Sequence, residues 1–417
     1  MIPFEVYFDE LRYQNPTGLS QIINWRYYEE EKMGLISSED EKWVSDTLKK
    51  IENKMVPVTE RNRNKIPYTT DENGRFDDRS DKKEICWWTN GFWGGEMWQL
   101  YKLTGNEMFK EEAVLVEEKL DAAFLNYNGM DHDAGFRWLP TAVINYKLNN
   151  GEDAKNRGLL AAANLAGRFN LNGNFIRAWN DWGDGRDTTG WAIIDCMMNL
   201  PLLYWASDVL GDPRFKKIAM AHADTAMKNF IREDGSVRHI VGFDPFTGEF
   251  LREYGGQGYG EGSSWARGQS WAVYGFALSY IHTGEKKYLE TAMKVADYVL
   301  SEMPETYLVP IDYRQPKTDD LEDSTAAAIT AGGLTEIAKS LIKEGKEDRA
   351  KEYLTAAVKL LKALDSHSCD YTLYKDNLLT RGSVDYHGNG HHMAIIYGDY
   401  YYIEALMKLN GTALNIF

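Results

Sequence analysis

A short turn phrase recurs five times along the chain, and it limits the possible folds more than any other feature. Each copy combines a glycine with charged residues: TGNEMF (104–109), NGEDAKN (150–156), GDPRF (211–215), TGEKKYL (283–289) and EGKEDRA (344–350). An apolar stretch with helical periodicity precedes each glycine, and a charged amphipathic stretch follows it. Because glycine readily adopts the left-handed conformation that ends a helix, the phrase predicts five αα-hairpins.

These hairpins, with one more helix near each end of the chain, predict twelve main helices. The helices before the glycines cover 90–104, 133–149, 191–210, 265–282 and 323–343, those after them cover 107–127, 153–169, 213–231, 286–302 and 347–365, and the terminal ones cover 39–57 and 393–410. Stretches of the first set, such as AIIDCMMNLPLLYWAS, are apolar almost all round, which is typical of interior helices, whereas the second set is two-faced. The pattern predicts an all-α fold, an (α/α)6 barrel of six helical hairpins.

Long connections lead from the outer helices of this barrel to the inner ones. They cover 170–190, 232–264, 303–322 and 366–392 and are rich in Gly, Trp, Asp and His. Long irregular loops in a compact domain are usually functional, so we expect them to form an active-site cleft on one face. No Pro- or Ser-rich linker divides the chain, which predicts a single catalytic domain over 1–417, with 1–38 as an N-terminal extension packed on the barrel.

Composition excludes several classes of function. The chain has 47 Lys and Arg against 63 Asp and Glu, a net charge of −16 that disfavours nucleic acid as a partner. Three widely spaced cysteines and the absence of ligand-spaced motifs indicate no metal and no cofactor. We expect neither a membrane span nor an obligate protein partner, and a location in the cytoplasm or, if an export signal has been removed, the periplasm.

Two aspartates form the strongest candidate for catalysis. Asp133 lies at the start of the predicted helix 133–149, where the helix dipole favours an ionised carboxylate, although a plain N-cap explains it equally well. Asp195 lies one turn inside the helix 191–210 among Ile, Cys and Met, where burial should raise its pKa, unless the residue is a buried partner of Arg or Asn. Two carboxyl groups with separated pKa values are the pattern that glycosidases require.

Aromatic and polar residues accompany these aspartates in the loops. They are found in WWTNGFW (87–93), at Trp179, Trp182, His239 and Gln257, and in SWARGQSW (264–271). Tryptophan rings can stack on sugar faces, and Arg and Gln can bind hydroxyl or carboxylate groups. For any one tryptophan a place in the core is the alternative, and for Arg267 the alternative is an ion pair with an acidic neighbour.

Seven phrases, taken in order, resemble unsaturated glucuronyl hydrolases of glycoside hydrolase family 88. They are WWTNGFWGGEMW, HDAGF, RFN…FIRAW, IIDCMMNLPLLYWAS, RHIVGFDP, GQGY…SSWARGQSWAVYG and IYGDYYYIEAL, and the resemblance extends from about Lys42 onward. It implies an (α/α)6 barrel. It also implies hydrolysis of an unsaturated uronic acid, with a C4=C5 double bond, from the non-reducing end of oligosaccharides that polysaccharide lyases produce.

The resemblance further implies roles for individual residues. Asp195 corresponds to the general acid and base and Asp133 to its partner carboxylate, while the substrate-binding set is His239, Gln257, Arg267 and Trp271, with Trp88, Asn90 and His132 as weaker correspondences. In the implied mechanism Asp195 protonates C4, water adds at C5, and the resulting hemiketal opens and expels the downstream sugar.

One segment departs from the family pattern. Members that accept sulfated glycosaminoglycan fragments have serine and lysine in the last long loop, where this chain reads SVDYHGNG (383–390) without lysine. The source polysaccharide therefore stays open, and so does the related specificity for unsaturated rhamnogalacturonyl units of pectin. A non-catalytic sugar-binding helical scaffold is the alternative from another class, although such a scaffold gives no reason for a carboxyl group at Asp195.

Overall fold

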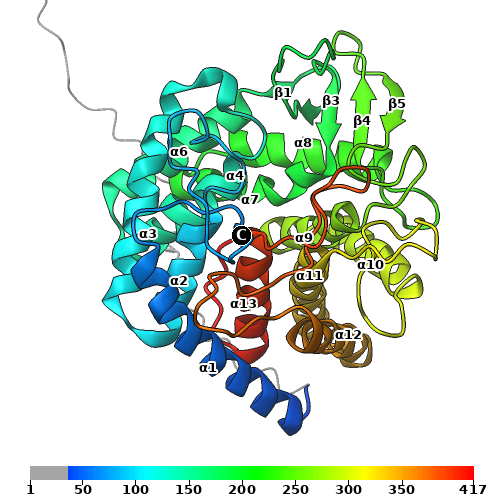
Figure 1. Cartoon of the computed structure of the whole chain (residues 1–417). Helices are drawn as coiled ribbons and strands as arrows, with labels where there is room; N and C mark the ends of the chain where they lie inside the picture. Colours follow the sequence, from blue (N-terminus) through cyan, green and yellow to red (C-terminus); the bar gives the residue numbers. More distant parts are fainter. Residues whose placement is uncertain (1–35) are drawn as a thin grey trace, which may run out of the picture.

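The computed structural model describes residues 36–417, and its helices form two concentric rings (Figure 1). The inner ring consists of α2 (Phe92–Thr104), the segment Ala134–Asn149, α7 (Leu200–Leu210), α9 (Ala266–Thr283), α11 (Ser324–Lys343) and α13 (Ile396–Asn410). The outer ring consists of α1 (Ser38–Arg61), α3 (Glu107–Lys119), α6 (Glu152–Ala166), α8 (Arg214–Asn229), α10 (Lys286–Ser301) and α12 (Glu347–His367). Because α13 packs against α2, the inner ring is closed, and the predicted (α/α)6 barrel is confirmed.

Burial follows the predicted division between the two rings. Every residue of α9 from Ala266 to Ser279 is buried, whereas α10 buries only the face that contacts the inner ring. Gly105, Gly211, Gly284 and Gly345 adopt positive φ angles after α2, α7, α9 and α11, as the turn phrases predict. At the second phrase the left-handed residue is Asn150 instead, and Gly151 precedes α6 as its N-cap.

The predicted helix 133–149 is broken into three parts. The short α4 (Ala134–Trp138) is followed by a wide π-helical turn, η3 (Leu139–Val143), and then by α5 (Ile144–Asn149). Pro140 lies at the break and has no N–H to donate to the preceding turn, which favours such an interruption. The predicted helix 107–127 also ends early, at Lys119, and continues as the 3-10 turns η1 (Leu120–Leu125) and η2 (Tyr127–Gly129).

The start of the predicted helix 191–210 is wrong. Trp191–Ile193 forms strand β3, Ile194–Met198 forms the 3-10 turn η4, and the α-helix begins only at Leu200. Strand β3 pairs antiparallel with β4 (Ile240–Phe243), which pairs with β5 (Phe250–Tyr254). A second small sheet joins β1 (Phe169–Asn170) to β2 (Phe175–Ile176). These sheets lie in or beside the predicted long loops, and in Figure 1 they are found at the upper edge of the ring of helices.

The C-terminal end of the chain is part of the barrel core. Residues 1–35 of the predicted extension 1–38 lie outside the described residues. The C-terminal Phe417 turns back into the centre of the inner ring, where Figure 1 marks the end of the chain. Its ring centroid lies 5.9 to 6.5 Å from those of Phe92, Phe136, Tyr400 and Tyr401. No helix within 36–417 is long and apolar enough to cross a membrane.

Candidate active site

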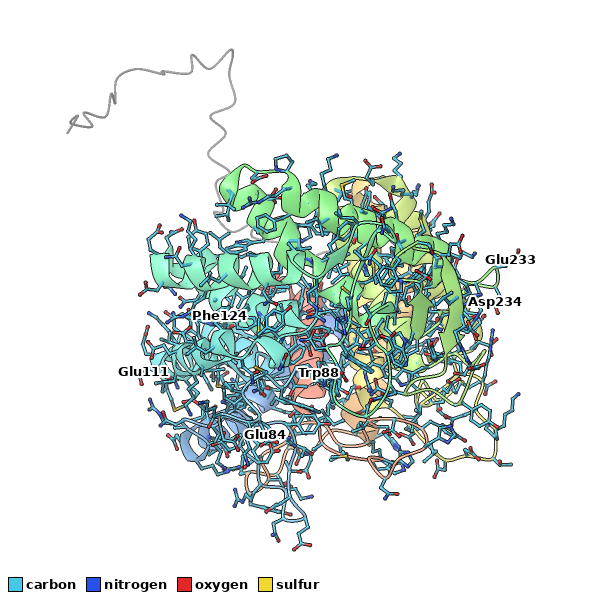
Figure 2. The ribbon with its side chains drawn as sticks, turned by 90° about the horizontal axis from the view of Figure 1, so that it is seen from above. Glu84, Trp88, Glu111, Phe124, Glu233 and Asp234 are labelled. Carbon is cyan, nitrogen blue, oxygen red and sulfur yellow. The ribbon has the colours of Figure 1, made fainter. Side chains whose placement is uncertain are left out.

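A cavity of about 650 Å³ opens on the barrel face that carries the loops. Three of the predicted long loops reach it through Trp179, Gln257 and Val384, while residues of the connection 303–322 do not line it. The aromatic part of its wall consists of Tyr68, Trp87, Trp88, Trp179, Trp182 and Tyr397. In Figure 2 the cavity residue Trp88 lies near the middle of the molecule with Glu84 below it, whereas Glu233 and Asp234 lie at the right edge.

Asp195 faces this cavity from the turn η4, directly after β3. Its Oδ1 atom is buried and has no hydrogen-bond partner among the described residues. Burial raises the pKa of Asp195 to about 7, although the nearby positive charge of Arg267 acts in the opposite direction. The sequence correctly predicts a raised pKa, but a strand and a 3-10 turn, not the interior of a helix, present the group.

Asp133 lines the same cavity at the N-terminal end of α4, but it does not behave as the sequence predicts. Its side chain makes no capping hydrogen bond to that helix, which is only five residues long. Burial, together with the neighbouring charges of Asp131 and Asp195, raises the pKa of Asp133 well above its usual value. The expectation of a carboxylate kept ionised by the helix dipole is therefore wrong, because two further carboxyl groups and desolvation outweigh one short helix.

Arg267 both lines the cavity and forms an ion pair, the two alternatives that the sequence left open. From the first turn of α9 it lines the cavity, and its Nη1 atom also forms a buried ion pair with Asp323 Oδ2 at 2.7 Å. The guanidinium donates further to the carbonyl oxygens of Ser383 at 2.5 Å and Val384 at 2.7 Å. It thus ties the last long loop to the barrel while one side of it faces the cavity.

Gln257 and His239 form the next layer of this wall. Gln257 lines the cavity and donates from Nε2 to the Val384 carbonyl at 2.7 Å, while its backbone N–H donates to His239 Nδ1 at 3.0 Å. His239 does not line the cavity, and its ring stacks on Trp265 with 4.1 Å between centroids. Burial lowers the pKa of His239 to about 3, so the imidazole is neutral at physiological pH.

The four remaining predicted residues divide into two pairs. Trp88 and His132 line the cavity, and His132 Nε2 lies 3.6 Å from Asp133 Oδ1. Asn90 and Trp271 are fully buried and do not line it. Asn90 donates from its side-chain amide to the carbonyl oxygens of Glu84 and Ile85 in the loop before Trp88. Trp271 packs beneath the site against Phe136, with 5.1 Å between the ring centroids.

Two acidic residues near the site were not predicted from the sequence. Asp131 lines the cavity and accepts hydrogen bonds at Oδ1 from the Asp133 backbone N–H at 3.0 Å and from Arg137 Nη2 at 2.8 Å. Asp323 is the buried partner of Arg267. The spacing of Asp131, two residues before Asp133, was a visible signal, but Asp323 lies 56 residues from Arg267 and only the fold brings them together.

An (α/α)6 barrel with two carboxyl groups of raised pKa in an aromatic cavity has the fold and the chemistry of a glycoside hydrolase. The model of Glycosyl Hydrolase Family 88 matches residues 53–410, and the chain belongs to this family.

Curated and solved relatives agree with this assignment. The chain is 35% identical to the unsaturated glucuronyl hydrolase of Bacillus sp. (strain GL1), over 84% of this chain and 94% of that protein. It is 34% identical to the unsaturated chondroitin disaccharide hydrolase of Streptococcus pneumoniae (strain ATCC BAA-255 / R6), over 77% and 81% of the two chains. The crystal structure of the Bacillus sp. GL1 enzyme superposes with a TM-score of 0.78, covering 86% of this chain and 95% of that one, at 34% identity. A Streptococcus agalactiae unsaturated glucuronyl hydrolase mutant complexed with dGlcA-GalNAc6S gives a TM-score of 0.73 at 27% identity, covering 95% and 97%.

Proposed function

We propose that this glycoside hydrolase releases an unsaturated (4,5-ene) glucuronic acid from the non-reducing end of lyase-generated oligosaccharides, such as glycosaminoglycan disaccharides. The observation that carries the proposal is Asp195, a carboxyl group whose pKa of about 7 leaves it partly protonated at neutral pH. The residue lines a cavity that can hold a sugar, and its buried Oδ1 has no hydrogen-bond partner among the described residues. An acid that retains its proton in a water-accessible, aromatic cavity suits the protonation of a substrate carbon.

In this mechanism Asp195 transfers its proton to C4 of the double bond, and positive charge develops at C5 and the ring oxygen. Water then adds at C5 and gives up a proton to the carboxylate of Asp195, which restores the acid. The hemiketal opens, and the downstream sugar leaves as an alcohol. Asp133 fixes the geometry of the site from its neighbouring position, and no covalent glycosyl-enzyme forms.

The other predicted residues fall into two groups, those that line the cavity and those that lie behind its wall. Arg267, Gln257, Trp88 and His132 line the cavity and are proposed to contact the unsaturated sugar directly. His239, Asn90 and Trp271 lie behind them and act by holding these groups in place. The neutral His239, for example, accepts a hydrogen bond from the backbone of Gln257 and so fixes the loop that carries this amide.

Labelled water tests the reaction. In ¹⁸O-water the label should enter at C5 of the released sugar, whose double bond has been consumed, and a saturated glucuronide with the same leaving group should not react. A conventional glycosidase with the same carboxyl groups would place the label at C1. Label at C1, or rapid hydrolysis of the saturated glucuronide, would contradict the hydration mechanism. A panel of lyase products that includes rhamnogalacturonan fragments would identify the aglycone.

A further inference from the structure

Asn199 contacts both of the segments that carry the active-site carboxyl groups. The residue is fully buried between η4 and α7 and does not line the cavity. Its Nδ2 atom donates to Asp133 Oδ1 at 3.2 Å and to the Asp195 backbone carbonyl at 3.2 Å. Its Oδ1 atom accepts a hydrogen bond from the Phe136 backbone N–H at 2.8 Å.

We propose that Asn199 is a positioning residue that fixes the Asp133 and Asp195 carboxyl groups relative to each other. The inference rests on the proposed function for the roles of the two aspartates. They come from segments more than 60 residues apart, the short helix α4 and the turn η4, and neither segment is a long regular element. One amide side chain bonds to the Asp133 carboxyl group and to the Asp195 backbone, so it sets the spacing between the two segments that the reaction requires.

The backbone on both sides leaves this amide little room to move. A Cβ atom on Gly135 would lie 2.5 Å from Asn199 Cα and 2.7 Å from its Oδ1, so only glycine allows α4 to approach so closely. On α9, a Cβ atom on Gly275 would lie 2.5 Å from Met197 Cβ and 2.9 Å from the Met197 carbonyl carbon. The turn η4 is therefore held between α4 and α9 with Asn199 at one contact.

The amide also acts on the charge of Asp133. The titratable groups that act on this carboxyl group are Asp131, His132 and Arg137 from its own segment, and Asp195 and Cys196 from η4. Hydrogen-bond donation from Asn199 favours the ionised form of Asp133, against the two neighbouring carboxyl groups. Loss of the donor should therefore raise the pKa of Asp133 further.

Two substitutions test the proposal. Asn199→Ala removes all three hydrogen bonds, while the nearly isosteric Asn199→Asp keeps the acceptor for Phe136 and loses the donor to Asp133. In both variants kcat should fall by about 10²-fold, the scale of a misplaced catalytic group. KM should change less than two-fold because Asn199 lies outside the cavity wall. The pH–rate profile should differ from that of the wild type because the pKa of Asp133 rises.

Asn62→Ala is the matched control. Asn62 is equally buried and donates from Nδ2 to the Val58 carbonyl at 2.9 Å, at the end of the outer helix α1. Its variant should lose stability but keep the kcat and pH profile of the wild type. If Asn199→Ala does not fold, the kcat and pH profile of Asn199→Asp test the proposal. Wild-type kcat and pH profile in the folded Asn199→Asp variant would overturn the proposal.

A second readout separates this inference from the proposed function. Infrared titration of the carboxyl bands, assigned with Asp133→Asn and Asp195→Asn, needs no substrate. It should show a higher pKa for Asp133 in both Asn199 variants and no change in Asn62→Ala. If the wild type fails to act on unsaturated disaccharides, the proposed function is wrong, while an unshifted Asp133 band contradicts the positioning role by itself.

Discussion

The raised pKa of Asp195 results from two opposing effects. Burial raises its pKa, and Arg267 opposes this because a positive charge favours the carboxylate. The guanidinium of Arg267 is already paired with Asp323, which limits its effect on Asp195. The carboxyl group can therefore remain protonated near neutral pH beside an arginine.

Asp195→Asn should remove the acid without disturbing the fold. Asparagine has the same shape and burial, but it cannot donate a proton to carbon, and general acid catalysis contributes about 10²–10⁴-fold to a rate. We expect turnover to fall by at least that factor, measured as loss of double-bond absorbance, with unchanged circular dichroism. If the variant kept more than a tenth of wild-type turnover, another group would be the acid.

The pH dependence follows from the same group. Because the protonated form is active, kcat/KM should decline as the pH rises through about 7. A carboxyl group whose folded-state pKa is raised favours folding at low pH, and this contribution is lost as the pH rises toward 7. Asp195→Asn should therefore be more stable than the wild type at pH 8, and the difference should vanish near pH 4. Thermal unfolding at both pH values measures this, and equal stability at pH 8 would argue against the raised pKa.

Arg267→Ala should affect both binding and stability. Loss of a cavity-lining cation should raise KM for an anionic sugar, and the abandoned carboxylate of Asp323 should cost about 3–5 kcal/mol of folding free energy. Adding Asp323→Asn to this variant should restore much of the stability but not the KM. The two measurements are steady-state kinetics and denaturant unfolding, and an unchanged KM in Arg267→Ala would assign the residue to a structural role alone.

Residues could be predicted from the sequence where their neighbours in the chain determine their environment. The apolar residues around Asp195 correctly indicate burial and a raised pKa. Asp133 could not be predicted, because the charges that set its pKa come partly from Asp195, which only the fold brings near. The sequence also could not separate Arg267, which lines the cavity, from Trp271, which lies beneath it.

At the scale of elements, helix ends were predictable and interruptions were not. A left-handed glycine after an apolar helix is a local signal, so the hairpin turns are found where the turn phrases place them. Strand β3 depends on pairing with β4, almost 50 residues away, and no local periodicity reveals it. The break of the helix 133–149 at Pro140 was visible in the sequence, although the prediction continued the helix through it.

Phe417→Ala should show how strongly the C-terminal segment holds the ring together. The Phe417 side chain packs among Phe92, Phe136, Tyr400 and Tyr401 from three parts of the inner ring. Its removal should lower the free energy of unfolding by about 3–5 kcal/mol, as for other large buried aromatic side chains. Denaturant titration measures the loss. Phe246→Ala serves as the control because Phe246 is 84% exposed, and an equal effect of both variants would contradict this packing.

On the scale of the whole molecule, we expect the chemistry to need no ion from solution. Among residues 36–417 no three His, Cys, Asp or Glu side chains form a group that could hold a metal. We therefore expect EDTA and added divalent cations to leave kcat and KM unchanged once ionic strength is matched. Activity that is lost on chelation and restored by zinc, calcium or magnesium would overturn the proposed proton-transfer mechanism.

Closure of the inner ring by α13 against α2 has a consequence for how the chain is made. These helices are about 300 residues apart, and α1 also packs against α13. During synthesis the first eleven helices emerge from the ribosome before their closing partner exists, so the apolar flanks of α2 and α11 stay exposed until the end. Contacts over such sequence separations form slowly and favour aggregation of the incomplete chain. We expect nascent chains stalled before residue 396 to bind chaperones and to gain protease resistance only when α13 has emerged.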